Sequence, residues 1–73
     1  MSRLPVLSGR DLVRALSKLG FALDRQKGSH MILFRASPPT TLTIPDHREL
    51  DRGTLRAILR QAGISPTELQ SLL

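Results

Sequence analysis

The chain has 73 residues, enough for one small hydrophobic core, and its 40% hydrophobic content is too high for a disordered protein. It contains no cysteine, which excludes disulfides and thiolate metal sites. From the length we expect a single domain over residues 1–73. Eleven Lys and Arg against six Asp and Glu give a net charge of +5, so we also expect a polyanionic partner.

The start of the chain and its apolar segments bear on location. Residues 1–7 lack the apolar run of a signal peptide. No segment approaches the roughly 18 apolar residues that a membrane-spanning helix needs. We therefore expect a cytoplasmic protein that has no membrane partner.

The first predicted element is a helix over residues 9–19. The Ser8 hydroxyl can cap its start, and Asp11 suits the positive end of the helix. Apolar residues then recur at helical spacing, and Gly20 stands where a left-handed cap is expected. These apolar residues are Leu12, Ala15, Leu16 and Leu19.

Three strands are predicted next. Residues 21–26 and 30–35, joined by a turn at 27–29, have the pattern of a β-hairpin. The Ser37-Pro38-Pro39 segment ends the second strand. Residues 40–44 are β-branched and alternating, which indicates a third strand that ends at Pro45 because proline cannot donate to a ladder.

Two helices complete the predicted order. Apolar residues at 55, 58, 59 and 62 mark an amphipathic helix that stops at Gly63. Ser65-Pro66-Thr67-Glu68 is a capping-box pattern that starts a short helix carrying Leu69, Leu72 and Leu73. The order α-β-β-β-α-α predicts an α+β fold in which a three-stranded antiparallel sheet has its helices packed on one face.

Cations recur every fourth residue on the polar face of both long helices. The first basic stripe is Arg10, Arg14 and Lys18, and the second basic stripe is Arg52, Arg56 and Arg60. Like charges at this spacing are mildly unfavourable unless a partner offsets them. RNA phosphates and the acidic surface of a protein partner would explain the stripes equally well. With two Phe and no Tyr or Trp, recognition by base stacking is not expected to dominate.

The segment Gln26–His30 is the most informative for chemistry. It places an imidazole at the start of a strand, with a cation at Lys27 and a hydroxyl at Ser29 beside it. Histidine has an unperturbed pKa of about 6.5, so it can take or give a proton near neutral pH. Metal-free RNA cleavage needs such a base for the 2′-hydroxyl and a cation for the phosphoryl oxygens. A lone histidine at a strand edge is also often a surface or capping residue, and spacing alone leaves both interpretations open.

Other side chains near this segment have less defined roles. His47 is either a second acid–base group or a residue that orders its loop. Ser29 projects differently from His30, so a serine-hydrolase arrangement has little support. Two histidines without a carboxylate cluster make a poor metal site, and we expect neither metal nor cofactor.

Several short motifs together resemble the HicA (YcfA-like) family of mRNA interferase toxins. They run from Leu4-Pro5 and Ser8-Gly9 through Leu19-Gly20-Phe21, the Lys27-Gly28-Ser29-His30 turn, Ile44-Pro45 with His47, and Gly53-Thr54-Leu55-Arg56 to Ile58–Ile64. No single motif is decisive, but their order and spacing are specific across nearly the whole chain.

The resemblance implies a fold similar to the double-stranded-RNA-binding domain and an activity against mRNA. It implies that the histidine of the Gly-Ser-His turn, here His30, is catalytic. Gly28 is then the residue that lets the backbone turn tightly beside the substrate, while Lys27 and Ser29 carry over only as neighbours of the site. It also implies a HicB-like antitoxin that covers the active face.

Two other functions are compatible with the residues. One is a non-catalytic RNA-binding module of the same fold, and the other is a protein-interaction domain whose basic face meets an acidic partner. A steep loss of RNA affinity with salt would argue against the second, because displaced counterions report phosphate contacts.

Overall fold

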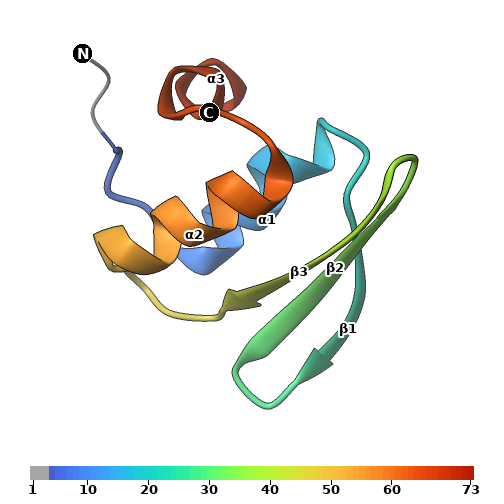
Figure 1. Cartoon of the computed structure of the whole chain (residues 1–73). Coiled ribbons are helices and arrows are strands. Elements are labelled where there is room, and N and C mark those ends of the chain that lie inside the picture. The colour runs from blue at the N-terminus through green and yellow to red at the C-terminus, as the bar shows by residue number, and fades with distance from the viewer. Residues whose placement is uncertain (1–3) are drawn as a thin grey trace.

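The computed structural model describes residues 4–73 (Figure 1). The elements follow the expected order: α1 (Gly9–Ser17), β1 (Ala22–Lys27), β2 (His30–Ala36), β3 (Pro39–Pro45), α2 (Arg52–Ala62) and α3 (Pro66–Leu72). Residues 1–3, on which part of the signal-peptide expectation depends, lie outside the described residues. None of the helices within residues 4–73 has the length and apolar character needed to cross a bilayer.

Helix α1 is two residues shorter than the pattern predicts. Its start is as expected, because the Asp11 backbone N–H donates to Ser8 Oγ at 3.0 Å and the Asp11 carboxylate accepts from the Ser8 N–H. At its other end, residues 18–20 donate to carbonyls three residues back. The last turn therefore tightens before the chain leaves through Gly20, whose φ is +91°.

The three strands form one antiparallel sheet in the order β1-β2-β3. The hairpin turn contains only Gly28 and Ser29, because Lys27 pairs with His30 as the last residue of β1. The expected three-residue turn at 27–29 was thus one residue too long. Gly28 has φ +61°, which a two-residue hairpin turn of this kind favours and which side-chain-bearing residues rarely adopt.

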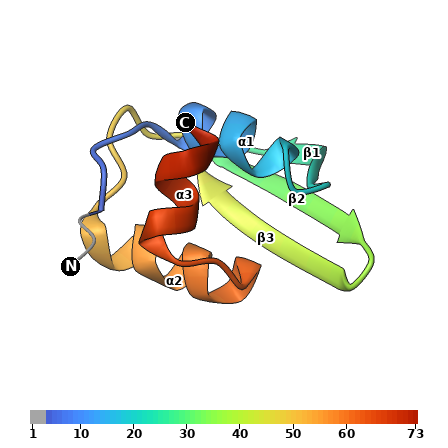
Figure 2. The same ribbon diagram turned by 90° about the horizontal axis from the view of Figure 1, so that it is seen from above.

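The helices lie on one face of the sheet in two layers. Helices α1 and α2 lie against the sheet, and α3 lies across their outer side (Figures 1 and 2). The core between them is apolar, and its fully buried side chains are Leu12, Leu16, Leu33, Leu42, Ile44, Leu55 and Leu69. Of the leucines predicted to anchor α3, Leu69 is buried, Leu72 is partly buried and Leu73 is 54% exposed. This α+β arrangement agrees with a fold like that of the double-stranded-RNA-binding domain.

A close backbone approach fixes the start of α1 against the end of β3. A Cβ on Gly9 would lie 2.0 Å from the Pro45 carbonyl oxygen, so no other residue fits there without a shift. The Gly9 N–H also donates to the His47 carbonyl at 2.9 Å. Helix α1 therefore begins directly beside the loop that carries His47.

Candidate active site

The hairpin presents His30 on the face of the sheet opposite the helices. Met31 and Leu33 are buried against the helices, and side chains alternate along a strand. His30 therefore shares the open face with Ile32 and Phe34, and its side chain is exposed. An imidazole in this position is accessible to a large substrate such as a nucleic acid.

Lys27 is the cross-strand neighbour of His30. The two residues are Cα partners on either side of the Gly28-Ser29 turn, and both are exposed. Directly opposed residues on antiparallel strands have side chains within reach of one another on the same face. The fold thus brings together the cation and the imidazole that the sequence suggested.

Asp46 is a site residue that sequence reasoning missed. Its carboxylate accepts from Arg10 Nε and Nη2 at 3.1 and 3.2 Å, and from Gln26 Nε2 at 3.2 Å. Its backbone N–H donates to the Ser29 carbonyl at 2.6 Å. The hydrogen bonds from Arg10, helped by its positive charge and by Gln26, lower the pKa of Asp46 below its ordinary value of 3.8. The carboxylate is therefore ionised at neutral pH.

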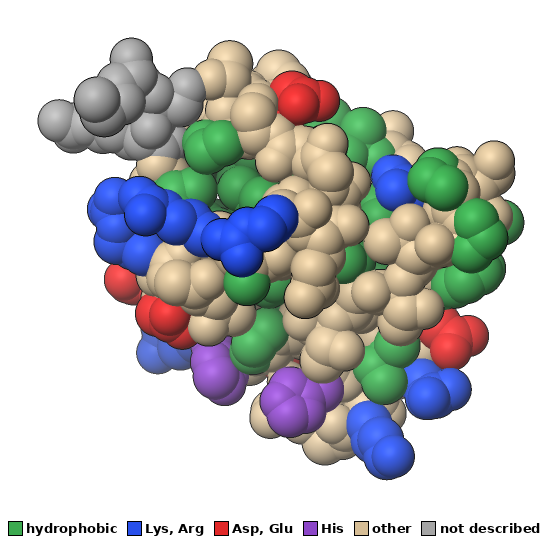
Figure 3. Space-filling view, in the orientation of Figure 1, with side chains coloured by type: hydrophobic (Ala, Val, Ile, Leu, Met, Phe, Trp, Pro, Cys, Tyr) green, Lys and Arg blue, Asp and Glu red, His purple; other side chains and the backbone are tan. Residues whose placement is uncertain are grey.

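His47 lies on the same side of the molecule as His30. Residue 46 is joined to the Ser29 carbonyl, and His47 follows it directly. The His47 side chain is exposed, and Figure 3 shows both imidazoles of the chain on one face. The loop role is supported by the His47 carbonyl, which accepts from Gly9, while the free imidazole leaves the acid–base role open.

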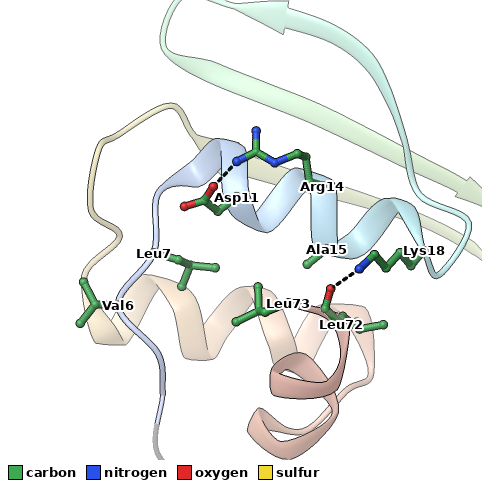
Figure 4. Close-up of a pocket in the computed structure, with 8 residues that line it drawn as sticks. All are labelled: Val6, Leu7, Asp11, Arg14, Ala15, Lys18, Leu72 and Leu73. Atoms are coloured by element: carbon green, nitrogen blue, oxygen red, sulfur yellow. Dashed lines mark hydrogen bonds and ion pairs between the residues drawn. The ribbon is translucent and has the colours of Figure 1, made fainter.

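The first basic stripe differs from expectation, because its members have partners within the chain. Arg10 pairs with Asp46, Arg14 pairs with Asp11, and Lys18 Nζ donates to the Leu72 carbonyl at 2.6 Å (Figure 4 shows the last two). Asp11 lies one turn before Arg14 on the same helix, whereas Asp46 and Leu72 are far from their partners in the sequence. The helical spacing of the cations therefore did not reveal the two distant contacts.

The second basic stripe is exposed and has no acidic partner among residues 4–73. Figure 3 shows Lys and Arg side chains gathered over α2 on the face that also carries the imidazoles. The two stripes, indistinguishable in the sequence, therefore differ in how much of their charge is available to an external anion.

A surface hollow lies apart from the hairpin that carries His30. The hollow drawn in Figure 4 has mainly apolar walls from the N-terminal segment, α1 and the end of α3. None of the hairpin residues lines it. Within residues 4–73, no three His, Asp or Glu side chains form a group suited to a metal ion.

A family model described as the HicA toxin of bacterial toxin-antitoxin systems matches residues 9–64. The matched range covers α1, the whole sheet and α2, and it includes every candidate site residue named above. No curated protein gives a significant match to the chain.

Proposed function

The chain belongs to the HicA toxin family of bacterial toxin–antitoxin systems, and from this premise we propose that it is a metal-independent endoribonuclease that cleaves mRNA with His30 as its catalytic residue. In this proposal residues 1–73 form a single toxin domain, and it acts in the cytoplasm without a cofactor. The observation that carries it is the exposed imidazole of His30, opposite Lys27 on the open face of the sheet.

The proposed reaction uses the RNA itself as nucleophile. His30 takes the proton of a 2′-hydroxyl, and the oxygen attacks the adjacent phosphorus while the bond to the 5′-oxygen breaks. Lys27, or an arginine of one of the helices, stabilises the charge that develops on the phosphoryl oxygens. A proton passes to the departing 5′-oxygen, from His47 as the leading candidate or from solvent. The products are a 2′,3′-cyclic phosphate and a free 5′-hydroxyl.

The two basic stripes differ in how well they suit contacts to RNA. The second basic stripe is exposed and has unpaired charge, which suits contacts to RNA phosphates. The first basic stripe is largely engaged within the chain, so its affinity for phosphate is reduced. Toxin–antitoxin membership implies an antitoxin, and we propose a HicB-like protein that covers the His30 face.

A non-catalytic RNA-binding module is the second candidate. The same exposed arginines on α2 favour it, because they would hold RNA whether or not cleavage follows. It differs from the main proposal in one outcome, since RNA would be bound and released intact.

The ends of the cleaved RNA test the proposal. Purified protein is incubated with a labelled mRNA in excess chelator, and the ends of any fragments are analysed. The proposal predicts cleavage that leaves cyclic phosphate and 5′-hydroxyl ends. Fragments with 3′-hydroxyl and 5′-phosphate ends would exclude it, because that pattern requires water as the nucleophile. Intact RNA that remains bound would favour the binding module.

A further inference from the structure

We propose that Asp46 is a positioning residue that holds the Gly28-Ser29 turn, and with it His30, against the start of α1. The inference rests on the proposed function for its catalytic consequence, whereas the positioning itself stands on the contacts of Asp46. No motif in the sequence marks this residue, which follows the last residue of β3.

The proposed link between α1 and the turn has two halves, and the first joins Asp46 to helix α1. The Arg10 guanidinium donates two roughly parallel hydrogen bonds to the two carboxylate oxygens, a geometry with high directional specificity. The Asp46 side chain is only 19% exposed, although that of Arg10 is 71% exposed. Helix α1 is itself fixed to this loop through Gly9 and His47. The carboxylate is therefore anchored on the helix side.

The second half joins Asp46 to the turn. The Asp46 N–H donates to the Ser29 carbonyl at 2.6 Å. Gln26 Nε2 donates to the Asp46 carboxylate at 3.2 Å and to the Gly28 carbonyl at 3.1 Å. Both residues of the turn are thus held, one directly and one through Gln26. His30 comes next in the chain and is paired in the sheet with Lys27 and Pro45, so the contacts of Asp46 act together with the strand pairing to set its position.

The network needs a carboxylate at this position. An ionised carboxylate has two acceptor oxygens, which here receive the Arg10 fork and the Gln26 amide together. An asparagine offers one acceptor oxygen and would turn an NH₂ group toward donors. Asp46→Asn therefore keeps the size of the side chain but removes at least one of the three hydrogen bonds that the carboxylate accepts, together with the negative charge that attracts Arg10.

The activity test compares Asp46→Asn with Asp24→Asn. Both variants remove one negative charge, but the only side-chain partner of Asp24 within residues 4–73 is Arg25, so Asp24 lies outside the network. We expect single-turnover cleavage at saturating RNA to fall about 10- to 100-fold in Asp46→Asn, since small misplacements have effects of this size. The RNA Kd should stay the same or tighten, because the protein becomes more positive. Asp24→Asn should cleave like the wild type.

Amide hydrogen exchange provides a readout that does not depend on activity. In Asp46→Asn, and to a lesser extent in Gln26→Ala, the N–H of residue 46 should exchange several-fold faster than in the wild type or Asp24→Asn. The effects of the two changes on cleavage should be less than additive, because both break one network. Circular dichroism and the Tm establish that each variant is folded.

The outcomes separate this proposal from the proposed function. Unchanged exchange at residue 46 with a cleavage rate within two-fold of the wild type would overturn the positioning role. A loss of cleavage that is seen only below saturating RNA, and that is matched by the rise in RNA Kd, would also overturn it, since that pattern indicates lost binding. A wild-type protein that never cleaves RNA would refute the proposed function, and the exchange data alone would then decide whether Asp46 holds the turn.

Discussion

Replacing Gly9 by alanine should destabilise the fold more than an added methyl group ordinarily does. The new Cβ would lie 2.0 Å from the Pro45 carbonyl oxygen, whereas such contacts are essentially never shorter than 3.0 Å, so the backbones must separate by about 1 Å. The hydrogen bond from the Gly9 N–H to the His47 carbonyl would lengthen with that shift. Overpacking of this kind costs about 1–3 kcal/mol. For a domain of this size the Tm should fall by roughly 5–20 °C.

The matched control is Gly53→Ala in α2. Its Cβ would lie 3.4 Å from Asp51 Oδ2, an ordinary contact, and the φ of Gly53 is not positive. Alanine should therefore stabilise α2 by up to about 1 kcal/mol. Thermal and urea unfolding of both variants measure the difference. A Gly9→Ala protein as stable as the wild type would refute the argument that the start of α1 needs this close approach.

Three further predictions concern the core, the charge network and the second basic stripe. Leu33→Ala should lower the free energy of unfolding by about 2–5 kcal/mol in urea titrations, because the side chain is fully buried, whereas Phe34→Ala on the open face should change it by less than about 1 kcal/mol. The depressed pKa of Asp46 contributes stability that is present above its ordinary value of 3.8 and is lost as the pH falls through the folded value, so the Tm should drop in acid and drop less steeply in Asp46→Asn. Replacing all three arginines of the second basic stripe by Gln should reduce the slope of log RNA affinity against log salt by about 2, while Arg14→Gln should leave it nearly unchanged.

Local signals were sufficient to predict most of the fold. Ser8 and Ser65 cap their helices as expected, with the Glu68 N–H donating to Ser65 Oγ at 3.1 Å. These features depend on residues within a few positions of each other, so the sequence pattern contains them.

The candidate site was predicted only in part, because its organisation depends on distant residues. Lys27 and His30 are near neighbours in sequence, and their pairing across the turn follows from the hairpin. Asp46 meets Arg10 from 36 positions away, and no local pattern indicates that contact. The contacts of Arg10 with Asp46 and of Lys18 with Leu72 are also long-range, and they removed much of the expected equivalence of the two basic stripes.

The most direct test of the central claim is the cleavage of a labelled mRNA by the wild type and by His30→Ala, measured in excess chelator with folding confirmed by circular dichroism. The account predicts that the wild type cleaves the RNA and that His30→Ala binds it with similar affinity but leaves it intact. Equal cleavage by both proteins would contradict the account, because the reaction would then not depend on His30.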